Sequence, residues 1–199
     1  KARDDPRSLA MDKTSLIYMA IEIEKKYKLT AGQFADLAHA LAEAGAEFVG
    51  EEFEVNTIYL SDRLSKNSSI VRIRTTEQRS ILTFKRRIEN TSDTKQQLEI
   101  ESEISDPKAV AAILTHLDLT PRLLYEKRRK TYRLKDVEIV LDELPFGLFA
   151  ELEGNLMTIK EAEMILGIED LEVEHETYPR LTARLGKQVE GIIEARFQV

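Results

Sequence analysis

The chain has 199 residues and a formal net charge of −7, and 42% of its residues are apolar while 33% are charged. This apolar fraction supports one folded domain and excludes a wholly disordered chain. Because the net charge is negative, duplex nucleic acid is not expected as the main partner. The absence of cysteine excludes disulfides, thiolate metal sites and a cysteine nucleophile, and three scattered histidines do not predict a zinc site.

The N-terminal segment, residues 1–18, contains a proline, several charges and no apolar stretch of the kind that a secretory signal needs. We interpret it as an N-terminal extension or an expression remnant, followed by a folded domain at residues 19–199. No apolar run in the chain approaches the roughly 18 residues of a membrane-spanning helix. We therefore expect a cytoplasmic protein without a membrane partner, and a homodimer is an open alternative.

The first predicted strand covers residues 21–27, where apolar and charged residues alternate with a period of two. A helix follows from Thr30, because Thr30 and Gln33 form a capping box and an apolar stripe runs on toward Gly45. Strand candidates then follow one another between about residues 53 and 104, separated by polar segments that are typical of turns.

A second helix is predicted to begin at Asp106, with Pro107 at the first helical position, where its missing N–H costs nothing. Three further strands follow, and they are expected at residues 124–134, 137–144 and 149–154. Runs of strands with few helices between them predict a largely antiparallel α+β domain.

Two more helices are predicted in the C-terminal part of the chain. Thr158 and Glu161 are interpreted as a second capping box, which opens a short helix that stops at Gly167. A last helix is predicted over about residues 179–197. Its apolar face is expected to consist of Leu181, Leu185, Val189, Ile192 and Ile193.

Nearly every predicted strand carries two charges at positions i and i+2, with apolar residues on the opposite face. Alternation alone is satisfied by a sheet with one face in water and the other on the core. The charges, however, come in blocks of one sign. The acidic pairs are Glu22/Glu24, Glu99/Glu101 and Glu151/Glu153, and the basic pairs are Arg72/Arg74, Lys85/Arg87 and Lys127/Arg129.

Like charges side by side on a strand repel each other. Such pairs are more easily retained, despite this cost, when the strands face a common ligand or metal. If the sheet closes on itself, the acidic and basic strands line one cavity. Carboxylates bind Mg²⁺ or Mn²⁺, and arginine and lysine bind phosphate oxygens, so this cavity suits a polyanion escorted by divalent cations. The apolar faces then point outward beneath the helices, which predicts a barrel with a polar interior.

The charged positions also follow the motif order of a known family. The first strand carries Glu22-x-Glu24-x-Lys26, and the motifs after it are Asn56-Thr57-Ile58-Tyr59, Val71-Arg72-Ile73-Arg74, Thr83-Phe84-Lys85, Glu99-x-Glu101, Lys127-x-Arg129, Leu141-Asp142-Glu143 and Phe149-x-Glu151-x-Glu153. In this order, over roughly residues 20–195, they resemble the CYTH superfamily, the triphosphate tunnel metalloenzymes. Two positions depart from the pattern: Asn56 stands where the family usually has aspartate, and Gln97 where a basic residue is common.

The resemblance implies an eight-stranded antiparallel β-barrel that forms a tunnel, with helices packed outside, and a small-molecule triphosphate as the substrate. It implies catalytic roles for Lys26, Lys127 and Glu24. It implies that Mg²⁺ or Mn²⁺ is held by Glu22, Glu24, Glu99, Glu101, Asp142, Glu151 and Glu153. The triphosphate oxygens would be bound by Arg72, Arg74, Lys85, Arg87, Lys127 and Arg129.

Three functions remain open on the sequence. The first is metal-dependent hydrolysis of inorganic triphosphate or of a nucleoside or thiamine triphosphate. The second is the class IV adenylate cyclase reaction, which converts ATP to cyclic AMP and pyrophosphate with the same clamp. Cyclase-type members often carry a longer segment with histidine and arginine before the first strand, and its absence here favours hydrolysis. The third is a non-catalytic polyphosphate or nucleotide-binding module, which the full set of acidic positions argues against.

Overall fold

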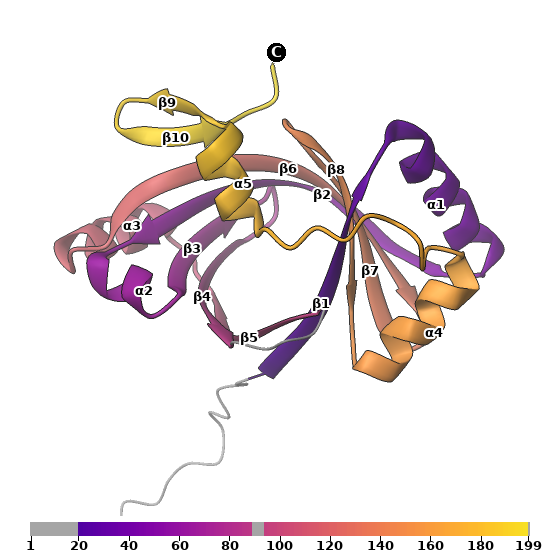
Figure 1. Cartoon of the computed structure of the whole chain (residues 1–199). Coiled ribbons are helices and arrows are strands. Elements are labelled where there is room, and N and C mark those ends of the chain that lie inside the picture. The colour runs from indigo at the N-terminus through magenta and orange to yellow at the C-terminus, as the bar shows by residue number, and fades with distance from the viewer. Residues whose placement is uncertain (1–19, 89–93, 199) are drawn as a thin grey trace, which may run out of the picture.

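The computed structural model describes residues 20–88 and 94–198, so the segment interpreted as an N-terminal extension, residues 1–18, lies outside the described residues. The fold is α+β and rich in strands (Figure 1). In chain order its elements are β1 (Ala20–Leu29), α1 (Ala31–Glu43), β2 (Glu47–Leu60), α2 (Asp62–Lys66), β3 (Ser69–Thr75), β4 (Ser80–Ile88), β5 (Lys95–Glu103), α3 (Pro107–His116), β6 (Thr120–Leu134), β7 (Val137–Leu144), β8 (Gly147–Glu153), α4 (Leu156–Leu166), α5 (Tyr178–Leu185), β9 (Lys187–Val189) and β10 (Ile192–Ala195).

Within the described residues, β1 to β8 form a closed ring of antiparallel neighbours. Their order is β2-β3-β4-β5-β1-β8-β7-β6, and β2 pairs with β6 to close the ring. In this register Glu24 of β1 lies opposite Glu153 of β8, and Lys85 of β4 lies opposite Glu99 of β5. The predicted antiparallel sheet that closes on itself is confirmed, and with it the expectation that charged strand faces turn toward one another.

The outer faces of the ring pack against helices, as the alternation of apolar and charged residues predicts. Figure 1 shows α1 and α4 on one side of the ring and α3 on the opposite side. Beneath α1 and α4, Leu41, Ile139 and Leu152 are completely buried in one apolar cluster. Beneath α3, Leu114 packs in a cluster with Ile73. These two apolar clusters therefore lie outside the ring. A third cluster lies inside it at the end covered by α5, where Leu123 and Tyr178 belong both to the apolar core and to the cavity lining, and the rest of the interior is left for polar side chains.

Two predicted helix starts are confirmed in detail. The N-cap of α1 is Thr30, and both hydrogen bonds of the capping box with Gln33 are present. The N-cap of α3 is Asp106, whose carboxylate accepts a hydrogen bond from the backbone N–H of Ala109 at 2.9 Å, and Pro107 occupies the first turn.

The start of α4 differs from the prediction. Its N-cap is Asn155, whose side-chain oxygen accepts from the backbone N–H groups of Met157 and Thr158, each at 3.0 Å. Thr158 already lies inside the helix and donates its hydroxyl to the carbonyl of Asn155, so the expected capping box with Glu161 is wrong. The predicted end is confirmed, because Gly167 takes the left-handed conformation with φ 65°.

The predicted last helix over residues 179–197 is wrong beyond Leu185. The chain passes Gly186 and forms the hairpin β9–β10, and β10 pairs in parallel with β6. A Cβ at Gly186 would lie 2.6 Å from the carbonyl oxygen of Thr182, so the helix ends at a place where only glycine fits. Glu190 and Gly191 both have positive φ, which is the conformation that a two-residue hairpin turn requires.

A short helix that the sequence did not suggest, α2, lies between β2 and β3. Ser61 caps it by accepting a hydrogen bond from the backbone N–H of Leu64 at 3.3 Å. Among residues 20–88 and 94–198, no helix combines the length and the apolar character that a membrane span requires.

Candidate active site

The ring surrounds a partly open cavity of about 520 Å³, and side chains from each of its strands and from α2 and α5 line it. All of the side chains predicted for substrate, metal or catalysis line this cavity except Asp142. The structure thus brings both signs of charge to one cavity. The predicted residues in the lining are Glu22, Glu24, Lys26, Arg72, Arg74, Lys85, Arg87, Glu99, Glu101, Lys127, Arg129, Glu151 and Glu153.

Asp142 is completely buried, and both of its carboxylate oxygens are engaged. Arg129 donates from Nε to Oδ1 at 2.7 Å and from Nη2 to Oδ2 at 2.6 Å, because the two residues lie opposite each other on β6 and β7. Arg129 Nη2 also donates to Glu151 at 2.7 Å. Burial alone would lower the pKa of Arg129, but these carboxylates raise it well above its ordinary value.

A buried carboxylate that the motifs did not indicate lies among the cations of this wall. Glu54 of β2 is completely buried, 3.2 Å from Lys127 Nζ, 3.8 Å from Arg74 Nη1 and 3.9 Å from Arg129 Nε. Asn56 donates to it at 3.1 Å. Burial opposes the charged form, yet the three cations hold the pKa of Glu54 far below its usual range. Glu54 is therefore the shared counter-ion of three cations predicted to bind substrate or act in catalysis.

Lys127 is 2% exposed and lies between two carboxylates, 3.2 Å from Glu54 and 3.6 Å from Asp142. Burial, together with the neighbouring Arg129, lowers the pKa of Lys127 to about 8. The ammonium is consequently poised to gain from an additional negative charge in the cavity.

A second ionic cluster joins β1, β3, β4 and β5. Arg72 Nη2 lies 3.2 Å from Glu101 and 3.6 Å from Glu99. Lys85 pairs with Glu99 and lies 3.6 Å from Glu22. Burial is the largest influence that raises the pKa of Glu99, and the hydrogen bond with Glu22 is the next largest. These contacts bring predicted phosphate-binding cations and predicted metal-binding carboxylates together in pairs.

A third cluster lies beside the segment that leads into α5. Lys26 Nζ is 3.0 Å from Glu151, and Lys95 Nζ is 3.4 Å from Glu24. Both lysines donate to the backbone carbonyl of Glu176 at 3.4 Å. Burial and the charge of Lys26 lower the pKa of Lys95 to about 8. The predicted catalytic lysine on β1 is thus held between the ring and this segment.

Two carboxylates face each other where β7 and β8 meet. Glu138 and Glu153 lie directly opposite each other and both line the cavity. Partial desolvation at the cavity wall and the charges of Glu138 and Glu24 raise the pKa of Glu153 to about 7 against the charge of Lys85, although the residue as a whole is exposed. A divalent cation would relieve this repulsion, and carboxylate oxygens are the donors that Mg²⁺ and Mn²⁺ prefer. Among residues 20–88 and 94–198, no group of three or more potential ligands is preassembled around one point.

Tyr178, at the start of α5, enters the ionic interior from outside the ring. Its hydroxyl donates to Asp142 Oδ2 at 2.8 Å. The centroid of its ring lies 3.7 Å from Lys26 Nζ and 5.5 Å from Lys127 Nζ. Burial, and next the charges of Asp142 and Glu151, raise its pKa well above the ordinary value, so the hydroxyl keeps its proton.

Sequence reasoning missed Glu54, Lys95, Glu138 and Tyr178 as members of the site. Glu54 shares its strand face with Asn56, and Lys95 shares its face with Glu99, so the period-two signal was available for both. Tyr178 follows no strand pattern, because it reaches the ring from a helix that is distant in the sequence.

The sequence profile of the CYTH domain matches residues 20–183. A search of curated proteins found no match. The fold is similar to PH1012 from Pyrococcus horikoshii, with 24% identity, a TM-score of 0.71, and coverage of 80% of this chain and 98% of that chain. It is also similar to protein Pfu-838710-001 from Pyrococcus furiosus, with 25% identity, a TM-score of 0.70, and coverage of 80% and 99%.

A further similar structure is HpAC1 from Hippeastrum, a candidate adenylyl cyclase described as having a dominant triphosphatase activity. It has 18% identity and a TM-score of 0.63, and the match covers 86% of this chain and 98% of that chain. At this identity the similarity shows a shared fold.

Proposed function

This chain belongs to the CYTH domain family, whose members depend in general on divalent metals, and from that membership we propose that it hydrolyses a triphosphate, most simply inorganic triphosphate. The observation that carries the proposal is the cavity lined by both signs of charge. A simple anion-binding site gains nothing from carboxylates beside its ligand, whereas a site for an anion with its metal needs them.

We propose that substrate binding exchanges ionic partners inside the ring. In the free protein the cations of the wall pair with carboxylates, as Arg72 does with Glu101. A triphosphate would bind the cations, and its divalent metal would bind carboxylates that those cations release, so each sign of charge in the wall would gain a partner from the substrate complex. The cations proposed to bind phosphate oxygens are Arg72, Arg74, Lys85, Arg87, Lys127 and Arg129.

The metal is proposed to be Mg²⁺ or Mn²⁺, and when bound it neutralises phosphate charge and lowers the pKa of a coordinated water. Its proposed ligands, direct or through water, are Glu22, Glu24, Glu99, Glu101, Glu151 and Glu153.

Lys26 and Lys127 are proposed to hold the oxygens on which negative charge develops when a terminal phosphorus–oxygen bond breaks. Glu24 is proposed to orient the attacking water beside the carboxylates that are proposed to bind the metal. Attack of water on the terminal phosphorus of inorganic triphosphate releases orthophosphate and pyrophosphate, and no covalent intermediate with the protein is needed.

A second candidate function is the cyclisation of ATP to cyclic AMP and pyrophosphate. The observation that favours it is an apolar part of the cavity wall, formed by Leu60, Ile70 and Leu123. Inorganic triphosphate has no use for an apolar surface, whereas a nucleoside could pack against it.

The test is an assay of the purified protein with tripolyphosphate, ATP and thiamine triphosphate, each with Mg²⁺, with Mn²⁺ and with EDTA. We expect metal-dependent release of orthophosphate, which EDTA abolishes. Cyclic AMP with pyrophosphate from ATP would identify the cyclase instead. Saturable binding without turnover of any substrate would contradict both enzymatic functions.

A further inference from the structure

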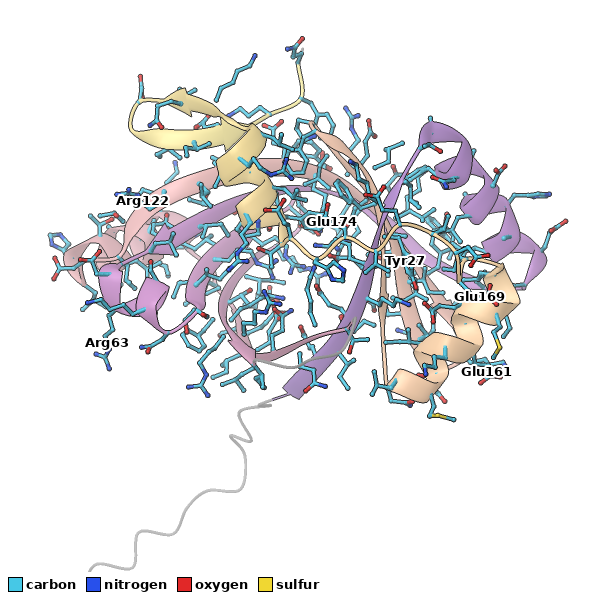
Figure 2. The ribbon with its side chains drawn as sticks, in the orientation of Figure 1. Tyr27, Arg63, Arg122, Glu161, Glu169 and Glu174 are labelled. Carbon is cyan, nitrogen blue, oxygen red and sulfur yellow. The ribbon has the colours of Figure 1, made fainter. Side chains whose placement is uncertain are left out.

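Tyr178 connects three groups of the cavity wall from a position outside the strands. The segment that precedes it lies along β1, where the backbone N–H of Glu174 donates to the carbonyl of Lys26 at 2.8 Å (Figure 2). This contact delivers the buried Tyr178 ring to Lys26 and Lys127, at 3.7 Å and 5.5 Å from its centroid. The Tyr178 hydroxyl meets Asp142 at 2.8 Å.

Both lysines are buried among carboxylates that compete with a substrate for them. Lys26 Nζ lies 3.0 Å from Glu151, and Lys127 Nζ lies 3.2 Å from Glu54. The face of an aromatic ring attracts an ammonium through its quadrupole and accepts none of the strong hydrogen bonds that a carboxylate would. A lysine held partly by such a ring keeps N–H groups available for phosphate oxygens.

The orientation of the Tyr178 ring is fixed at both ends. Its hydroxyl is bound to Asp142, whose own position is set by the bidentate contact with Arg129. It packs edge-to-face with Phe149, with ring centroids 5.4 Å apart and an interplanar angle of 73°. A ring fixed in this way keeps one position relative to the two ammonium groups.

We propose that Tyr178 is a positioning residue of the active site, whose ring holds the ammonium groups of Lys26 and Lys127 ready for a phosphate and whose hydroxyl keeps Asp142 as the partner of Arg129. Asp142 then contributes to the cavity wall as a counter-ion, although the sequence resemblance implied a metal ligand. This inference rests on the proposed function, because a phosphate group is the ligand that the lysines would receive.

The test compares tripolyphosphate binding by calorimetry in EDTA, using the full chain and variants at this position. Tyr178→Phe keeps the ring and is expected to bind within about threefold of wild type, while Tyr178→Leu is expected to bind at least about tenfold more weakly. Pentafluorophenylalanine at Tyr178 preserves the shape of phenylalanine but reverses the ring quadrupole, so it is expected to bind about fivefold more weakly than Tyr178→Phe. Leu181→Ala, in the same helix, is the control for loosened packing.

Several outcomes overturn the inference. Equal weakening by Tyr178→Leu and Leu181→Ala would reduce the role of Tyr178 to helix packing. Equal binding by the phenylalanine and pentafluorophenylalanine proteins would exclude the ring's electrostatic role, and this pair decides the matter even if Tyr178→Leu does not fold. Absence of tripolyphosphate binding by the wild-type protein both in EDTA and with Mg²⁺ would instead overturn the proposed function, and this inference with it.

Discussion

Glu54 is a single carboxylate on which three cations of the cavity wall depend. It is completely buried, and Lys127, Arg74 and Arg129 all lie within 4 Å of it at distances from 3.2 to 3.9 Å. Removing one partner of a buried ionic cluster costs more than the cluster itself contributes, because it leaves uncompensated charge.

Glu54→Gln is therefore expected to lower the free energy of unfolding of the free protein by about 3–5 kcal/mol. Chemical denaturation measures this loss. Glu52→Gln, which removes a partly exposed contact with Arg79 at 3.4 Å, is the matched control and is expected to cost less than about 1 kcal/mol. Similar losses in both variants would show that the buried cluster does not depend on Glu54.

Glu24→Gln is expected to abolish metal-dependent turnover while the fold persists, because this carboxylate is proposed to serve the metal and the attacking water. Turnover of tripolyphosphate and the thermal midpoint are measured on the same preparation. Glu103→Gln, at an exposed position of β5, is expected to keep full activity. A fully active Glu24→Gln protein would remove Glu24 from the proposed chemistry.

The affinity for tripolyphosphate is expected to fall as the pH rises above about 8, because Lys127, whose pKa is lowered to about 8, then loses its charge. Calorimetry in EDTA between pH 7 and pH 9 measures this dependence. In Lys127→Arg the dependence is expected to be shallower, since a guanidinium stays protonated. An unchanged slope in that variant would assign the dependence to another group.

The lowered pKa of Lys127 affects stability in the opposite direction: affinity is expected to fall as the pH rises, whereas the contribution of Lys127 to stability improves. The folded-state pKa of Lys127, about 8, lies below the ordinary value of 10.5, so the unfolded chain binds more protons between these two pH values. Below pH 8 the cost of burying the charged ammonium is fully present. As the pH rises from 8 toward 10.5, the contribution of this residue to stability improves.

At the scale of elements, strands were predictable and the C-terminal helix was not. Charged and apolar residues alternate with a period of two along β1, and that pattern places the charged residues on one face of a strand and the apolar residues on the other. Between residues 179 and 197 the apolar residues follow a helical spacing, but Gly186 and the Glu190-Gly191 turn interrupt the helix. The local turn therefore determined the structure here, although the spacing of the apolar residues is also compatible with a helix.

Gly186→Ala is expected to destabilise the junction between α5 and β9 by about 1–3 kcal/mol. The added Cβ would lie 2.6 Å from the carbonyl oxygen of Thr182 and 2.7 Å from Ile193 Cγ2. Gly32→Ala in α1 is the control, because nothing lies within 4 Å of its Cβ, and it is expected to stabilise by about 0.4–1 kcal/mol. Thermal denaturation distinguishes them, and equal midpoints would argue against the crowding at Gly186.

For the whole molecule, the closed ring and its ionic interior followed from the sign and parity of the strand charges. Contacts that cross the ring did not follow, because they depend on register and on elements distant in the sequence. Glu54 faces Lys127 only through the β2–β6 pairing, and Tyr178 reaches Lys26 only through the segment along β1. Strand patterns fix which face a residue lies on, and the partner across the ring is a property of the assembled fold.

Tripolyphosphate with Mg²⁺ is expected to stabilise the whole domain, because it binds the closed ring and not the unfolded chain. At a ligand concentration of about 100 times Kd the gain is about 2.7 kcal/mol, which corresponds to a rise in the thermal midpoint of about 5–10 °C. Differential scanning fluorimetry measures the rise, with sulfate at equal ionic strength as the control. An equal rise in sulfate would indicate general anion screening.

The closure of the ring by β2 and β6 has a kinetic consequence. Val55 pairs with Glu126 across a long stretch of intervening chain, and such a non-local pairing forms slowly because much loop entropy must be lost first. The β1–β8 seam is less local still, since Glu24 pairs with Glu153, and a polyanion can be bound from all sides only after both seams have joined. A bound polyanion should therefore slow the opening of the ring. It would prolong the lifetime of the native protein and leave the refolding rate nearly unchanged.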